Sequence, residues 1–183
     1  DGVQDPYVCA YGGFVVLEIG TDGAVEVQRP RLSPTTIERF FDNNLFYYTG
    51  LSRESTPLLA AQSAKRVLAL KHQTKAIGRE VYAAFCNNDL DRFGELMDEH
   101  WRVKKAMSKS MSSDLFDEIY ATARRTGALG GKLMGAGGGG YFMFYCPSEK
   151  AKRAVQKALA RFGMREMRFR LDRVGARAKS ITP

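Results

Sequence analysis

The chain has 183 residues, of which 44% are hydrophobic and 26% are charged, and its formal net charge is +8 at pH 7. This composition is typical of a globular protein and excludes a largely disordered chain. No window approaches the roughly 20 apolar residues of a membrane-spanning helix, and the polar start shows no signal peptide. Three cysteines without metal-ligand spacing predict reduced thiols and a cytoplasmic protein with no membrane partner.

The positive charge is spread along the sequence rather than gathered in one motif. No recognition helix or ribonucleoprotein motif accompanies it, so the sequence predicts no nucleic-acid partner, although the charge alone leaves that alternative open. Solvated helix faces explain most basic residues, and we place Lys104 and Lys105 among them. His72 and His100 have no partners at metal-ligand spacing and are expected to be structural or exposed. An anionic ligand at one site is the other explanation of the charge.

The first fifty residues predict a hairpin, a helix and a strand. Residues 12–19 and 24–28 are rich in β-branched and aromatic types and flank the turn residues 21–23, which indicates a β-hairpin. Ser33 followed by Pro34 is typical of a helix start, with the helix running to about residue 43. The apolar run 45–50 then predicts a buried strand.

The rest of the chain reads as long helices followed by two strands. Helices are expected from about residue 56 to 87, from a cap at Asp89, and from Ser112 or Ser113 to Gly127. A strand (141–146), a helix (148–162) and a strand (164–171) follow the glycine-rich loop. The side chains expected to face inward in the middle helices are Phe93, Leu96, Met97, Trp101, Leu115, Ile119, Tyr120 and Ala123. Together these elements predict an α+β architecture.

A shift in composition near residues 29–34 marks a candidate domain boundary. The roughly 30 residues before it are too few to fold alone, so residues 1–32 are predicted to be the end of an incomplete domain. Residues 33–183 are predicted to be a second domain.

The stretch "GGKLMGAGGGGYFMFY" (130–145) contains the main candidate site. It satisfies a dinucleotide-type glycine spacing, but the predicted order of helix, loop and strand is the reverse of that fingerprint, and Tyr141 stands where a Walker A loop needs lysine. A tight turn that binds nothing is one explanation. We favour a loop whose backbone amides bind phosphate, with Lys132 as a neighbouring cation. Its residues are Gly135, Ala136, Gly137, Gly138, Gly139 and Gly140.

"KLMGAGGGGYF" resembles the third signature motif of the GHMP kinase superfamily, whose loop lies beside the ATP phosphates and the substrate. "QDPYVCAYGGF" is similar to the segment that carries the catalytic aspartate in the sugar-kinase branch. "LFYYTGLSRES", "HWRVKKAMSKSMSSDLFDEIYATARRTGALGGKLMGAGGGG" and "MRFRLDRVGARA" resemble the C-terminal part of the D-glycero-D-manno-heptose 7-phosphate kinases. Nearly the whole chain is covered, and fucokinase-like relatives share several of these stretches.

The resemblance implies a fold and a reaction. Residues 33–183 would form the ferredoxin-like GHMP C-terminal domain with extra helices, preceded by the last β-hairpin of the N-terminal domain. The enzyme would transfer the γ-phosphoryl group of ATP, with Mg²⁺, to a sugar or sugar-phosphate hydroxyl, most simply that of heptose 7-phosphate, giving the 1,7-bisphosphate. The family's second motif is absent, which implies a missing N-terminal segment of the same protein and an inactive isolated chain; a homodimer is compatible with it.

The resemblance also assigns roles to residues. Asp5 would be the catalytic carboxylate, although Pro6 departs from the family pattern beside it, and without the family Asp5 would be read as a surface or capping residue. Gly12, Gly13, Arg53 and Lys132 are weaker candidates for substrate contacts. The alternatives are another GHMP kinase such as a fucokinase-like enzyme, or a non-catalytic module that binds a sugar phosphate or nucleotide.

Overall fold

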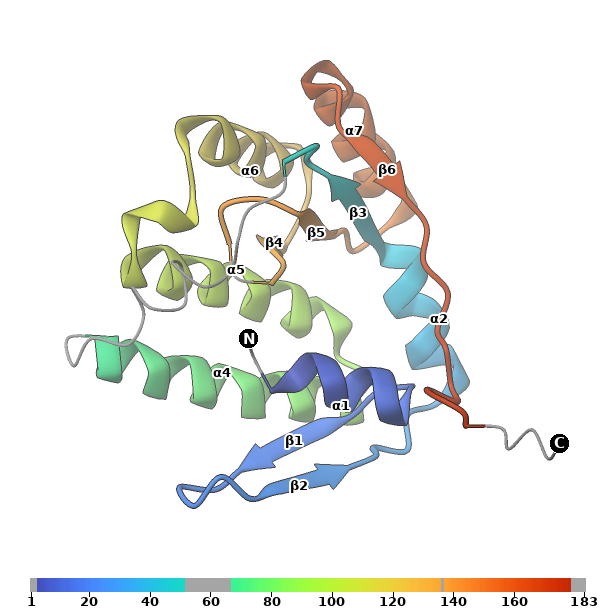
Figure 1. Cartoon of the computed structure of the whole chain (residues 1–183). Coiled ribbons are helices and arrows are strands. Elements are labelled where there is room, and N and C mark those ends of the chain that lie inside the picture. Colours follow the sequence, from blue (N-terminus) through green and yellow to red (C-terminus); the bar gives the residue numbers. More distant parts are fainter. Residues whose placement is uncertain (1–2, 52–66, 136, 179–183) are drawn as a thin grey trace, which may run out of the picture. The chain divides into compact units, whose positions relative to one another are not determined.

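A computed structural model describes residues 3–51, 67–135 and 137–178 of the chain (Figure 1). The described residues divide into two compact units. One unit combines residues 3–32 with residues 169–178, and the other contains the described residues between Ser33 and Arg168.

The first unit contains a helix and a two-stranded sheet. Strands β1 (Val16–Ile19) and β2 (Val25–Gln28) pair antiparallel, which confirms the predicted hairpin. Helix α1 (Gln4–Tyr11) precedes them and was not predicted. Pro6 argued against a helix at this place in the sequence. A proline in the first helical turn nevertheless costs little, because the amides there have no partner within the helix.

The second unit is built on an antiparallel sheet of four strands in the order β4-β5-β3-β6 (Figure 1). Its strands are β3 (Asn44–Tyr48), β4 (Gly130–Leu133), β5 (Tyr141–Tyr145) and β6 (Arg165–Met167). Among the described residues, three α-helices lie between the first two strands and one lies between the last two. This is the ferredoxin-like order with added helices, so the predicted α+β fold is confirmed.

Most helix boundaries follow the capping signals of the sequence. The helices among the described residues of this unit are α2 (Pro34–Asn43), α4 (Leu68–Cys86), α5 (Leu90–Met107), α6 (Asp114–Thr126) and α7 (Glu149–Leu159), with 3₁₀ turns η2 (Lys109–Met111) and η3 (Ala160–Phe162). Ser33, Asp89 and Ser113 each accept a hydrogen bond from the backbone amide three residues on. The start of the helix predicted from residue 56 falls outside the described residues.

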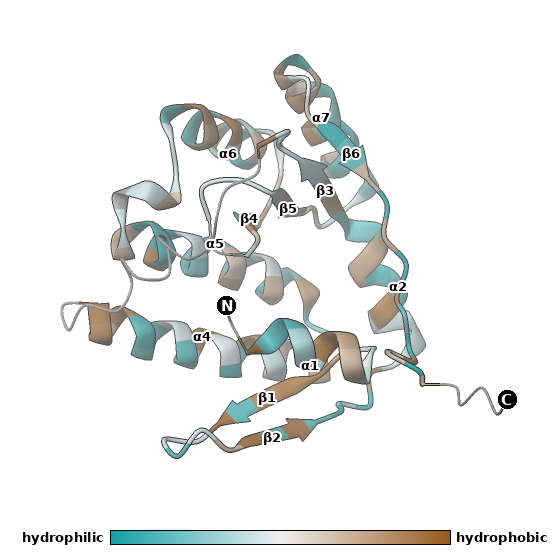
Figure 2. Ribbon diagram, viewed as in Figure 1, coloured by the Kyte–Doolittle hydropathy of each residue, from teal (hydrophilic) through white to brown (hydrophobic). Residues whose placement is uncertain are grey.

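The core of the second unit lies between the sheet and helices α5, α6 and α7. Phe142 and Phe144 of β5 pack against Phe116 and Tyr120 of α6 and the buried Trp101 of α5. Tyr145, on the opposite face of the same strand, contacts Phe93. Figure 2 shows the matching alternation of hydrophilic and hydrophobic bands along these helices.

Three expectations about this unit were wrong. Residues 130–133 form strand β4, so the glycine-rich segment is the loop of a β-hairpin and does not directly follow a helix. The final strand is only Arg165–Met167, shorter than the predicted 164–171. Leu115 is 51% exposed because it points outward in the first turn of α6.

Candidate functional site

The glycine loop connects β4 to β5 and is closed by a hydrogen bond from the Met134 amide to the Tyr141 carbonyl at 2.8 Å. Gly135, Gly137, Gly138 and Gly140 have φ between 69° and 101°. This left-handed region suits glycine and disfavours other residues, which explains the run of glycines at this place. Ala136 lies outside the described residues.

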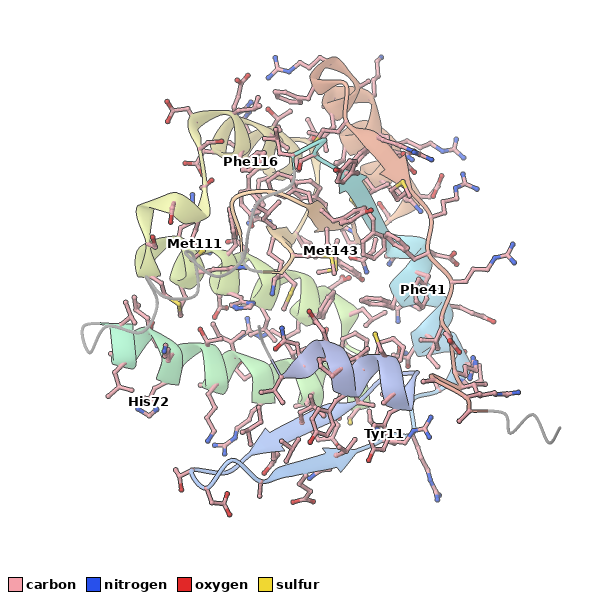
Figure 3. The ribbon with its side chains drawn as sticks, in the orientation of Figure 1. Tyr11, Phe41, His72, Met111, Phe116 and Met143 are labelled. Carbon is pink, nitrogen blue, oxygen red and sulfur yellow. The ribbon has the colours of Figure 1, made fainter. Side chains whose placement is uncertain are left out.

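Neighbouring backbone holds the second half of the loop. The Gly140 carbonyl accepts hydrogen bonds from the amide and hydroxyl of Thr49, both at 2.9 Å, and the Gly140 amide donates to the Leu51 carbonyl at 2.8 Å. The Gly138 amide donates to the carbonyl of Met111, the residue of η2 labelled in Figure 3, at 3.2 Å. A Cβ on Gly139 would lie 2.8 Å from the Leu51 carbonyl oxygen, so this close approach requires glycine.

These bonds determine which amides remain for a ligand. Gly138 and Gly140 already donate to protein carbonyls, whereas the amides of Gly135, Gly137 and Gly139 have no partner within the described ranges. The sequence predicted that the whole segment 135–140 would offer its amides to phosphate. In this conformation only part of the loop can do so.

Two lysines and a histidine lie at the start of the loop. Lys104 of α5 is 7% exposed, and its Nζ donates to the carbonyl of Leu133 at 3.3 Å and to that of Gly135. Lys132 of β4 places its Nζ 3.1 Å from Nδ1 of His100, also on α5. We call Lys104, Lys132 and His100 the basic cluster.

Burial shifts the pKa of every member of the basic cluster downward. It lowers the pKa of Lys104 to about 8. Burial, with the nearby Lys104 charge, lowers the pKa of Lys132 to about 7. Burial and the two lysines lower the pKa of His100 to about 3, so its imidazole is neutral at pH 7. Desolvation disfavours the charged form of each group.

The positive charge of the basic cluster lacks a carboxylate partner. No ion pair joins Lys104 or Lys132 to an acidic residue in the part of the chain that the structure describes. Asp98, one turn away from Arg102 on α5, instead bonds Arg102 and the Tyr120 hydroxyl. A buried cation without a counter-ion, beneath a loop with unpartnered amides, suits an anion.

The expected solvation of Lys104 was therefore wrong, because its side chain is buried. The helical spacing carried a signal that could have found Lys104: it follows Trp101 by three residues and Met97 by seven, and both are buried. Lys105, the next residue, does lie nearer solvent and pairs with Asp117 at 2.8 Å. His72, labelled in Figure 3, is exposed on α4, as expected.

The other predicted site residues either belong to the first unit or fall outside the described residues. Asp5 is exposed in the first turn of α1, within the first unit. Gly12 and Gly13 follow that helix with φ of 62° and 68°, and the Gly13 amide donates to the Asp172 carbonyl at 2.6 Å. A Cβ on Gly12 would lie 2.4 Å from the Gly175 amide nitrogen, so Gly12 has a packing role, whereas a Cβ on Gly13 would meet only the Arg29 side chain at 3.8 Å. Arg53 falls outside the described residues.

The described residues contain neither a candidate metal site nor a candidate membrane span. No group of three or more His, Cys, Asp or Glu side chains there is arranged to hold a metal ion. None of the helices in these ranges combines the length and the apolarity that crossing a membrane requires.

Comparison with known proteins identifies the fold. Residues 81–164 match the family model described as "GHMP kinases C terminal". The chain is 28% identical over 153 residues to D-glycero-alpha-D-manno-heptose 7-phosphate kinase of Campylobacter jejuni, a match that covers 81% of this chain and 45% of the relative. The chain thus spans about half the length of this curated relative.

Solved structures agree with the sequence comparison. A crystal structure of a protein assigned provisionally as a sugar kinase, from Campylobacter jejuni, superposes with a TM-score of 0.71 and 28% identity over 95% of this chain and 50% of that one. A D-glycero-D-manno-heptose 1-phosphate kinase from Bacteroides thetaiotaomicron shares the fold, with a TM-score of 0.73 and 24% identity over 100% of this chain and 50% of that one. Residues 81–164 thus resemble the C-terminal part of GHMP kinases, and the described residues share the fold of the Campylobacter jejuni structure.

Proposed function

We propose that the intact protein is an ATP-dependent sugar kinase and that D-glycero-D-manno-heptose 7-phosphate is its acceptor. The observation that carries this proposal is the glycine loop: three of its amides have no partner among the described residues, and the basic cluster at its start has no described carboxylate partner. The heptose 7-phosphate kinase of Campylobacter jejuni is the relative that suggests the sugar.

The chemistry requires little covalent participation from the protein. The acceptor hydroxyl gives its proton to a carboxylate while its oxygen attacks the γ-phosphorus of ATP, and the bond between that phosphorus and the β–γ bridging oxygen breaks to release ADP. We assign the carboxylate to Asp5, and binding of the ATP phosphates to the amides of the glycine loop. We expect Mg²⁺ to come with ATP and to be held largely by its phosphates.

The full-length protein provides the test of this assignment. Asp5→Asn keeps the size of the side chain but removes the proton acceptor, so kcat should fall by about 10²–10⁴ while the affinity for ATP changes little. Glu18→Gln, a neutralised exposed carboxylate on β1 of the same unit, is the matched control and should keep wild-type kcat. An Asp5→Asn enzyme with undiminished kcat would exclude Asp5 as the base.

A panel of acceptors separates the alternatives. Phosphorylation of heptose 7-phosphate at the anomeric hydroxyl supports the proposal, and preferential phosphorylation of fucose or mevalonate points to another GHMP kinase. Nucleotide binding without turnover of any acceptor would instead indicate a non-catalytic binding module. We predict a cytoplasmic location, where ATP is available and thiols stay reduced.

A further inference from the structure

The ammonium group of Lys104 connects three parts of the second unit. Its side chain comes from α5, and its Nζ donates to the carbonyl of Leu133, the last residue of β4, and to that of Gly135, the first glycine of the loop. An ammonium group has three donors, so a single buried side chain can hold a helix, a strand end and a loop together.

The first half of the loop depends on this residue more than the second half does. Gly138 and Gly140 are held by backbone bonds to Met111, Leu51 and Thr49. Between Leu133 and Gly137, Lys104 provides the two side-chain hydrogen bonds, and the Met134 amide donates to the Tyr141 carbonyl. Lys104 is therefore the side-chain anchor of this half.

Lys132 lies near Lys104 but does not anchor the loop. Its Nζ lies 3.1 Å from the His100 ring nitrogen, and within the described ranges it forms no hydrogen bond to a loop carbonyl. A buried ammonium also costs free energy when no carboxylate compensates it. An apolar residue would fill the Lys104 position more favourably if packing were its only role.

We propose that Lys104 is a positioning residue that fixes the first half of the glycine loop before any ligand arrives. The loop then presents the amides of Gly135, Gly137 and Gly139 without first having to be ordered, and such preorganisation strengthens binding because the ordering cost is already met by folding. That the ligand is the phosphate chain of ATP rests on the proposed function; the anchoring of the loop does not.

Hydrogen exchange of the unliganded full-length protein tests the anchor directly. Lys104→Met should increase exchange in peptides that cover residues 134–140 by about tenfold or more, the equivalent of losing one charge-assisted hydrogen bond. Lys105→Met is the matched control, because it removes the neighbouring lysine of the same helix, which pairs with Asp117 and has no bond to the loop. Lys104→Arg, which retains charge and donors, should recover part of the protection.

Nucleotide binding by the same variants tests the consequence. Lys104→Met should weaken ATP binding and raise the KM for ATP by about tenfold or more, with a smaller change in kcat, while Lys105→Met stays at wild-type values. If Lys104→Met fails to fold, Lys104→Gln keeps hydrogen-bond donors without the charge, and Lys104→Arg keeps both; each is read by the same two measurements.

The outcomes separate this inference from the proposed function. Loop exchange in Lys104→Met equal to that in Lys105→Met would overturn the positioning role, even if the wild-type protein proves to be a kinase. If loop exchange is faster in Lys104→Met but the wild-type protein binds no nucleotide, the positioning role is supported and the proposed function is rejected.

Discussion

At the scale of single residues, two neighbouring lysines differ in burial and in hydrogen-bond partners: Lys104 is buried, whereas Lys132 is partly exposed. Lys104 is surrounded by carbonyl oxygens, which favour its charged form, and its pKa is about 8. Lys132 faces an uncharged imidazole and a second ammonium, and its pKa is about 7. Burial is the main cause of the lowered pKa of both lysines.

We predict that Lys132 makes the stability of the fold increase with pH. The pKa of Lys132 is 10.5 in the unfolded chain and about 7 in the fold. Between these pH values the unfolded state binds more protons, so the free energy of unfolding increases as pH rises. From pH 7 to 9 the wild type should gain on the order of 1 kcal/mol per pH unit over Lys132→Met, measured by urea unfolding.

The groups that face Lys132 are Lys104 and His100, and His100 stays neutral throughout this range. Lys105→Met is the control and should follow the wild-type profile. Parallel pH profiles for wild type and Lys132→Met would show that the Lys132 amine is solvated in the fold.

At the scale of elements, α5 and β4 are unusually close, and glycines permit this. A Cβ added to Gly130 would lie 1.9 Å from the Gly94 carbonyl oxygen and 2.8 Å from the Asp98 amide nitrogen, both backbone atoms of α5. This approach brings Lys104 and His100 of the helix to the strand end at which the loop begins. The position of the basic cluster thus depends on two glycines, Gly94 of α5 and Gly130 of β4, at which the helix and the strand approach each other.

Gly130→Ala should therefore destabilise the fold by about 3 kcal/mol, because the added methyl group overlaps backbone that cannot rotate away. Gly78→Ala is the matched control: Gly78 lies within α4 with open space around its Cβ position, and alanine there should stabilise by up to about 1 kcal/mol. Thermal and urea unfolding measure both variants. A neutral Gly130→Ala would mean that α5 lies farther from β4 than described.

At the scale of the whole molecule, the chain returns to its first unit after completing the second. The Gly13 amide donates to the Asp172 carbonyl at 2.6 Å, the Ala176 amide donates to the Cys9 carbonyl at 2.9 Å, and Arg29 donates to the Arg173 carbonyl at 3.3 Å. Residues 169–178 thus belong with residues 3–32, although the sequence placed them in one domain with residues 33–168. The assignment of residues 1–32 and 33–183 to two GHMP domains stays a prediction.

The packing of residues 169–178 against residues 3–32 is tight at Gly12. Its φ is 62°, and a Cβ there would lie 2.4 Å from the Gly175 amide nitrogen, so Gly12→Ala should destabilise the first unit by about 3 kcal/mol. Gly23 has a φ of 82° and open space around its Cβ position, so Gly23→Ala should cost only about 1 kcal/mol. Hydrogen exchange over residues 4–28 should rise more in Gly12→Ala, and equal effects in both variants would contradict the packing role.

The sequence by itself determined the elements whose signals are local. Ser33, Asp89, Ser113 and Gly127 mark helix ends because a cap depends on residues within one turn, and the apolar run at 45–48 is buried in a central strand. The glycine run and its motif likewise identified the loop, since left-handed backbone is a property of single residues.

The tertiary structure decided everything that needs two distant segments. Only the pairing with β5 makes residues 130–133 a strand, because a short glycine-rich segment has no strand propensity of its own. Only the packing of α5 on β4 buries Lys104 and brings it to the loop carbonyls, and only the bonds to Met111 and Leu51 determine which loop amides remain for a ligand. Burial and hydrogen-bond partners are set by contacts between elements, and a linear sequence does not state them.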